Sequence, residues 1–309
     1  MDKINVNNYE VSGAELATDK KLAFLSDVHG NVNKLEKIIE LLKDMKTTSL
    51  LIGGDLVDDL KDTKRNEQIK ELLQELARTT DIFVAIGNHD MIYFGKDSKG
   101  KRKEIQGGSD ELKFWSSLGS VSRIYVSELP IYTSVASRFA LSDDIDISII
   151  NMPMTYYWNG EQKAHYDVLK KVLDNFSMAT KKFNILICHS PRGIIQGNSI
   201  DEYLKDIKAF NLILSGHMHC GLVPGFFRHD NIRQGIVGPY SRFWPDNAYG
   251  HVKDGKSDLL ISGGVEKLAN SLVGDGVVGS MINSIYPPEV CVFDMIPGEE
   301  SSFKKYKKM

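Results

Sequence analysis

The stretch LAFLSDVHGN, residues 22–31, decides how this chain begins to fold. Its apolar half has the length of a buried strand, and it ends in an acid, an imidazole and two turn-forming residues. Residues at the carboxyl end of such a strand lie where open α/β sheets place their ligands. Asp27 and His29 alone form a common Asp-x-His pair and favour an ordinary loop, so their significance depends on what recurs downstream.

The same pattern recurs four more times. Further short apolar runs each end in acidic, amide or imidazole side chains. The donors collected in this way are Asp27, His29, Asp55, Asn88, His189, His217 and His219. Each histidine taken alone is better explained as a buried, hydrogen-bonded imidazole, but the complete set favours a metal site over core packing.

The composition of this donor set indicates the kind of metal. Two carboxylates, one amide and four imidazoles suit manganese, iron or zinc. Seven donors are too many for one ion and natural for two ions that share a carboxylate. We therefore expect two divalent metal ions, manganese first, with iron or zinc as alternatives. Cys188, Cys220 and Cys291 show no paired spacing and are expected to be reduced thiols.

Composition and charge narrow the class of protein. With 309 residues, of which 42% are hydrophobic, the chain is expected to form one domain over 1–309. Its motif core would span 21–220, and strands within 255–296 would complete the sheets. The net charge of −3 gives no general attraction to nucleic acid or anionic membranes. We find no apolar signal segment and no apolar run of about 18 residues, and expect a soluble, cytoplasmic protein. Peripheral membrane contact, a lost anchor and the oligomeric state stay open.

Helical periodicity predicts four helices between the strands. They lie over 32–45, with a capping box formed by Asn33 and Glu36, around 69–76, around 112–118, and over 162–178. His165, on the last of these, is interpreted as structural. Further strands are expected near 121–126, 145–151, 258–262 and 290–295. The β-α-β-α-β order predicts an α/β fold with parallel strands and crossover helices.

Three segments are interpreted as loops: 95–108, 152–160 and 238–251. The first carries five cations within 96–103, and a solvated, mobile loop is favoured over a loop that faces an anionic substrate. Aromatic residues dominate 154–158, where a wall of the site, a lid and core packing are equally compatible. The basic tail, 304–308, is expected to be frayed surface.

The ordered blocks resemble those of the calcineurin-like metallophosphoesterase superfamily, bacterial single-domain type. They are Asp27-x-His29, Gly54-Asp55-x-x-Asp58, Gly87-Asn88-His89-Asp90, His189 and Gly216-His217-x-His219. The resemblance implies a four-layer α/β/β/α sandwich, in which helices flank two mixed β-sheets. It also implies one ion held by Asp27, His29, Asp55 and His219, and a second held by Asp55, Asn88, His189 and His217. Residues 91–93 replace the arginine of the phosphoprotein phosphatases, which speaks against protein-phosphatase activity.

Phosphoester hydrolysis fits this donor set on physical grounds. Two cations neutralise an anionic phosphoryl group and supply hydroxide for in-line attack on a small phosphomonoester or phosphodiester, a nucleotide or lipid head group included. His89 would protonate the leaving alkoxide, and Asp90 would orient His89. Asp58 either hydrogen-bonds a ligand or caps the following helix. The alternatives are a metal-stabilised binding or scaffold module, and a nuclease, for which the net charge offers no support.

Overall fold

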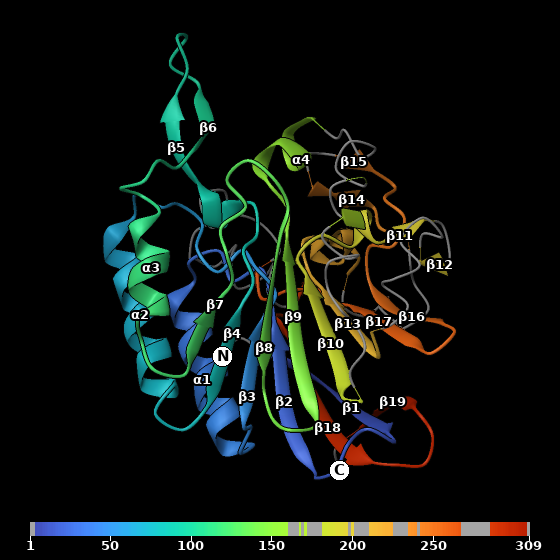
Figure 1. Cartoon of the computed structure of the whole chain (residues 1–309). Helices are drawn as coiled ribbons and strands as arrows, with labels where there is room; N and C mark the ends of the chain where they lie inside the picture. Colours follow the sequence, from blue (N-terminus) through green and yellow to red (C-terminus); the bar gives the residue numbers. More distant parts are fainter. Residues whose placement is uncertain are drawn as a thin grey trace.

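The computed structural model describes residues 4–159, 167, 170–171, 181–196, 199–200, 210–224, 234–239, 242–266 and 285–307. Within these residues, two large mixed sheets pack face to face, and helices cover the outer face of the first sheet (Figure 1). The predicted helix over 162–178, with His165, and a glycine-rich segment at 274–279 lie outside the described residues. No helix in the described part of the chain is long and apolar enough to cross a membrane.

The first sheet is built on parallel strands joined by helices. Its strands, in spatial order, are β19 (Ser302–Tyr306), β1 (Asn5–Gly13), β18 (Glu289–Pro297), β2 (Lys20–Leu25), β3 (Ser49–Ile52), β4 (Asp81–Val84) and β7 (Ile124–Val126). β2, β3, β4 and β7 are parallel, whereas β18 runs antiparallel to β2. Helices α1 (Val32–Asp44), α2 (Thr63–Leu76) and α3 (Lys113–Gly119) connect these strands, so the predicted crossovers are confirmed.

The second sheet has a parallel centre and antiparallel edges. Its spatial order is β16 (Gly250–Asp254), β17 (Ser257–Ile261), β13 (Leu212–Ser215), β10 (Phe183–Cys188), β9 (Ile145–Asn151) and β8 (Val135–Ala140). The four central strands β17, β13, β10 and β9 are parallel. The short elements are η1 (His89–Met91), η2 (Pro191–Gly193), β11 (Ile195–Gln196), β12 (Ser199–Ile200), η4 (His219–Leu222), β14 (Val237–Gly238) and β15 (Arg242–Phe243).

Both faces of the central strands are buried, which explains their continuous apolar sequences. In β2, Leu22 and Phe24 pack in the core between the sheets, where Ile185 and Ile187 of β10 also lie. Ala23 and Leu25 point the other way and belong to the core beneath the helices. The two-sheet α/β sandwich predicted for the chain is confirmed by this layering and by the two mixed sheets.

Two helix caps differ from expectation. The N-cap of α1 is Asn31, whose side chain accepts a hydrogen bond from Lys34 N at 3.0 Å, so the capping box predicted at Asn33 is wrong. The cap lies earlier because the helix already begins at Val32. The N-cap of α2 is Asp62, which accepts from Arg65 N, so Asp58 does not cap that helix.

The segment 95–108 is a β-hairpin rather than a loop. β5 (Ile92–Lys96) and β6 (Arg102–Gln106) pair antiparallel, and the hairpin projects from the body of the molecule (Figure 1). The Asp97 side chain accepts hydrogen bonds from Lys99 N and Lys101 N and so closes the turn. Local turn chemistry of this kind supports a polar strand pair that an apolar pattern does not reveal.

Three further segments that were predicted to be irregular contain regular secondary structure. Met154–Asn159 forms a short helix, α4, with Tyr156 and Tyr157 buried and Trp158 42% exposed. The basic tail forms β19, an edge strand that pairs with β1, because Phe303 packs on Tyr9 with ring centroids 4.9 Å apart. The segment 238–251 includes β15 and the start of β16.

Candidate metal centre

The carboxyl ends of strands from both sheets meet at one place. Loops after β2, β3 and β4 carry the first four donors, and loops after β10 and β13 carry the three histidines of the second half. The backbone N–H of His217 donates to both carboxylate oxygens of Asp27, at 3.1 and 3.0 Å, and joins the two sheets directly. The sequence-predicted donors are therefore neighbours in space, although 192 positions separate the first from the last.

The described part of the chain contains three groups of side chains that could bind a metal ion. Within each group, the donor atoms lie within 4.8 Å of one another. The groups are Asp27, His29 and His219; His29, Asp55 and His89; and Asp55, His189 and His217. Asp55 belongs to two groups: its Oδ2 lies 3.2 Å from His189 Nε2 and 3.7 Å from His29 Nε2. Its other oxygen accepts a hydrogen bond from His89 N. A carboxylate in this central position would be a ligand common to two neighbouring ions.

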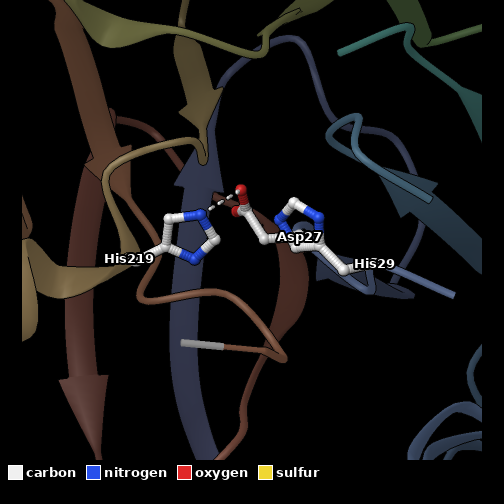
Figure 2. Close-up of side chains that lie close together, drawn as sticks. All are labelled: Asp27, His29 and His219. Atoms are coloured by element: carbon white, nitrogen blue, oxygen red, sulfur yellow. Dashed lines mark ion pairs between the residues drawn. The ribbon is translucent and has the colours of Figure 1, made fainter. Parts of the chain in front are cut away.

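Asp27 lies between two imidazoles. Figure 2 shows His29 and His219 on either side of its carboxylate, with His219 arriving from the loop after β13. Oδ1 of Asp27 is 3.7 Å from His219 Nε2, and Ser26 Oγ donates to Oδ2 at 2.6 Å. The two imidazole rings are stacked with centroids 5.1 Å apart. All three side chains therefore converge on one small volume.

The hydrogen bonds of the imidazoles indicate which nitrogen of each ring would bind a cation. Nδ1 of His189 lies 2.7 Å from Gly53 O, and Nδ1 of His219 lies 2.8 Å from Glu266 O. A carbonyl oxygen only accepts, so each Nδ1 carries a hydrogen, and in the neutral ring Nε2 has the lone pair. In both rings Nε2 faces a carboxylate oxygen. An imidazole nitrogen that faces a carboxylate attracts positive charge, which a proton supplies in the metal-free protein and a metal ion would supply when bound.

Asn88 supplies an independent test of this fit. Its side chain is 3% exposed, and its Oδ1 atom has no hydrogen-bond partner among the described residues. A buried amide oxygen without a donor is costly, on the order of 1–3 kcal/mol. Coordination of a cation would satisfy it, because amide oxygens are ordinary metal ligands. The residues present therefore fit a metal centre.

Protonation states in this cluster also favour a cation. Burial works to raise the pKa of Asp55, but the imidazoles of His189, His89 and His29 together outweigh it and hold that pKa well below its usual range. Burial lowers the pKa of His217 to about 3, with His189 contributing, so this ring is neutral at pH 7. Burial also opposes protonation of His189, yet Asp55 raises its pKa to about 9. A bound metal would displace that proton.

Backbone strain is concentrated at the same residues. Asp27, His29, Asp55, His217 and His219 all have φ between 47° and 68°, in the left-handed region. Each such residue costs on the order of 1–3 kcal/mol unless its surroundings impose the conformation. The strained turns direct side chains from strand ends into the shared volume, so the strain is a feature of the site.

Two motif glycines are required by close packing. Gly54 has φ +93°, and a Cβ atom there would lie 2.7 Å from His189 Nδ1. A Cβ atom at Gly87 would overlap the carboxylate of Asp55. Only glycine allows the backbone to approach the donors this closely, which explains the residue before Asp55 and the residue before Asn88.

The three predicted catalytic residues have different surroundings. His89 Nδ1 lies 3.1 Å from Asp58 Oδ1, which is also 3.3 Å from His29 Nδ1. Burial lowers the pKa of His89, but Asp55 and Asp58 outweigh it and raise that pKa to about 9. Asp58 is thus the carboxylate paired with His89, and the expectation that Asp90 orients His89 is wrong.

Asp90 instead holds the backbone around Asp55. Its carboxylate accepts hydrogen bonds from the N–H groups of Asp55, Val57 and Gly87, at 2.7, 3.0 and 2.8 Å. These three bonds direct the carboxylate into the backbone and away from the imidazole next to it in sequence. Burial, together with the charge of Asp55, raises the pKa of Asp90 to about 7.

Three neighbours of the donors were not assigned from sequence. The ring of Tyr157 lies 5.3 Å from that of His217, and the ring of Phe94 lies 6.1 Å from that of His89. The aromatic composition of 154–158 gave a signal for Tyr157, because a wall of the site was one of the three interpretations left open for that segment. Glu266, whose carbonyl binds His219, belongs to no motif and had no sequence signal.

The fold and the donor cluster define a class: a two-sheet α/β sandwich with a mixed carboxylate, amide and imidazole cluster at its strand ends. The family model described as calcineurin-like phosphoesterase matches residues 20–221, well over half of the chain. The chain belongs to that family, which confirms the resemblance carried by the five sequence blocks.

Individual relatives are distant. The chain is 24% identical, over 238 residues, to an uncharacterized metallophosphoesterase of Campylobacter jejuni. The match covers 75% of this chain and 52% of that protein, so the chain spans about half the length of this relative. A dimetal phosphatase from Danio rerio is 11% identical, with a TM-score of 0.45 and 79% and 87% of the two chains covered. GAP50, the anchor in the inner membrane complex of Plasmodium, is 15% identical, with a TM-score of 0.46 and 94% and 84% covered. These structural likenesses say nothing about the chemistry of this chain.

Proposed function

We propose that this chain is a metal-dependent phosphoric ester hydrolase that binds two divalent cations and hydrolyses a small phosphomonoester or phosphodiester. The observation that carries the proposal is the position of Asp55, whose Oδ2 lies 3.7 Å from His29 Nε2 and 3.2 Å from His189 Nε2, one candidate ligand of each cation. Membership of the phosphoesterase family supports the reaction class.

Two overlapping sets of ligands follow from the family motifs. Asp27, His29, Asp55 and His219 would hold one cation, and Asp55, Asn88, His189 and His217 the other. Manganese is our first choice, and iron and zinc suit the same donors. When bound, two such cations neutralise the phosphoryl oxygens and lower the pKa of a water molecule at the site.

His89 is the residue we assign as proton donor to the leaving group. Asp55 and Asp58 raise the pKa of His89, which favours the protonated imidazole, and Asp58 Oδ1 lies 3.1 Å from its Nδ1. Nε2–H is then the proton available to the departing oxygen. The His89 side chain is 17% exposed, whereas those of His29 and His189 are almost fully buried, so His89 lies on the side open to substrate.

The hairpin β5–β6 is the element we assign to substrate selection. Phe94 on β5 lies against His89, and the Arg102 guanidinium stacks on the Phe94 ring, 3.5 Å from its centroid. Glu104 accepts a hydrogen bond from Trp158 of α4, at 3.0 Å. Arg102, Glu104 and Trp158 line a cavity of about 750 Å³ beside the hairpin. A leaving group released at His89 would meet Arg102, which favours a leaving group that carries negative charge.

Metal analysis followed by a substrate panel tests the proposal. We expect about two divalent cations per chain, and manganese-dependent hydrolysis of phosphomonoesters or phosphodiesters. Asp55→Asn should reduce both metal content and turnover, because one side chain serves both cations. Asp143→Asn, at an exposed position, is the matched control and should change neither. A protein that binds two cations and hydrolyses no ester in a broad panel would instead be a metal-stabilised binding module.

A further inference from the structure

The segment Ser262–Glu266, which we call the C-terminal strap, lies against the candidate metal centre although it is far from every sequence motif. It follows β17 and is outside the residues matched by the family model. Val265 N donates to Ser26 O at 2.9 Å, and Glu266 N donates to Asp27 O at 2.8 Å. The strap is therefore bonded to the backbone of the first motif.

Gly264 shows how closely the strap approaches. It has φ +75°, and a Cβ atom at this position would lie 2.8 Å from Asp27 Cβ. On the other side, Glu266 O accepts the hydrogen bond from His219 Nδ1 that leaves Nε2 of that ring facing Asp27. Glu266 therefore binds the backbone of Asp27 and also fixes the tautomer of His219.

The side chain of Glu266 anchors this arrangement to helix α1. Its carboxylate accepts from Lys34 Nζ, at 2.8 and 2.9 Å, and from Asn31 Nδ2 at 2.7 Å. Lys34 is only 6% exposed, and buried lysines require a partner of opposite charge. Asn31 is also the N-cap of α1, so the first turn of the helix and the strap are held as one unit.

We propose that Glu266 is a positioning residue. Its ion pair with Lys34 fixes the Glu266 backbone, whose carbonyl orients the His219 ring toward the cation on the Asp27 side of the centre. The proposal rests on the two-cation function above. Glu266 bonds to Asp27, Asn31, Lys34 and His219, whereas His189 of the second group is held by Gly53 O. The two cations therefore differ in their dependence on Glu266.

Calorimetric titration of metal-free protein with Mn²⁺, checked by elemental analysis, tests this difference. In Glu266→Gln we expect one of two binding events to weaken by about 10- to 100-fold, the range for loss of an outer hydrogen-bonding partner, and the other to change less than about threefold. Glu266→Asp keeps the charge and should weaken the same event less, which covers the case in which Glu266→Gln folds poorly. In ¹⁵N spectra of the metal-free protein, the Nδ1–H signal of His219 should be lost in Glu266→Gln.

Asp146→Asn is the matched control. Asp146 is a buried carboxylate paired with Arg138 and Lys182, at the opposite end of the second sheet's strands. Its loss should lower the melting temperature and leave both Mn²⁺ binding events unchanged. Two intact binding events in Glu266→Gln, or an equal weakening of both, would overturn the proposal. If the unaltered protein bound fewer than two cations, the proposed function itself would fail, whereas absence of hydrolysis with two bound cations would leave the role of Glu266 standing.

Discussion

The Nδ1 atom of His89 lies 3.1 Å from the carboxylate of Asp58, and the same oxygen contacts Nδ1 of His29 at 3.3 Å. One carboxylate therefore touches both the residue we assign as proton donor and a candidate metal ligand. The rings of His29 and His89 meet edge to face, with centroids 4.5 Å apart. Under our proposal Asp58 links the proton donor to a metal ligand, and substitutions test the two roles separately.

Replacing His89 tests proton donation. His89→Asn should preserve the metal content and slow turnover by about 10²- to 10⁴-fold on an alkyl phosphate, whose leaving group needs a proton. An activated aryl phosphate, which leaves as a stable anion, should be slowed much less and serves as the internal control. The measurement is kcat/KM on both substrates with metal content determined in parallel. An unchanged rate on the alkyl phosphate would contradict the assignment.

Replacing Asp58 tests the pH dependence. His89 acts in its protonated form, so activity should fall as the pH rises through its pKa. The Asp58 carboxylate raises that pKa, and in Asp58→Asn the high-pH limb of kcat/KM should move to lower pH, by about one unit or more. Asp59→Asn, the neighbouring substitution, should leave the limb in place. A limb that stays in place in Asp58→Asn would show that Asp58 does not control the proton on His89.

Shortening the hairpin tests substrate selection. Replacing residues 96–103 by a two-residue Asn-Gly turn removes Arg102 and the basic tip while the start of β5 stays in place. KM for esters with an anionic leaving group should rise about tenfold, which corresponds to roughly 1.4 kcal/mol of lost binding. Metal content should not change. Lys99→Ala, in the exposed turn, is the control; equal kinetics on charged and neutral leaving groups in the shortened protein would remove the hairpin from substrate binding.

Stability at low pH should depend on Asp144, far from the metal centre. Burial would raise the pKa of Asp144, but hydrogen bonds from Lys20, Ser142 and Ala17 N outweigh it and hold that pKa below 3.8. A pKa lowered on folding stabilises the protein above pH 3.8 and loses this contribution as the pH falls further. Asp144→Asn should lower the free energy of unfolding by about 1–2 kcal/mol at pH 7.

Denaturant unfolding at several pH values measures this effect. The difference between Asp144→Asn and the unaltered chain should shrink as the pH falls below about 4, the ordinary pKa of an aspartate. The exposed Asp143→Asn should unfold like the unaltered chain throughout. A difference that is independent of pH would show that packing, rather than charge, accounts for the role of Asp144.

Much of the fold could be predicted because its central strands are locally encoded. β2, β3, β4, β10 and β13 each combine an apolar run with a turn at the carboxyl end, and both signals lie within a few neighbouring residues. The hairpin β5–β6 and the edge strand β19 could not be found in this way. β6 and β19 carry charged residues in place of a continuous apolar run, and the pairing depends on a turn held by Asp97 and on the contact of Phe303 with Tyr9.

The sequence by itself determined the donor residues, since a strand end gives both the residue type and its place at the edge of a sheet. Only the tertiary structure decided which groups pair: Asp58 with His89, Asp90 with the backbone around Asp55, and Glu266 with Lys34 across 232 positions. Such pairs depend on side-chain rotamers and on the packing of one sheet against the other. Neither is contained in the pattern of neighbouring residues, so the residues that hold the donors in position can be identified only from the folded structure.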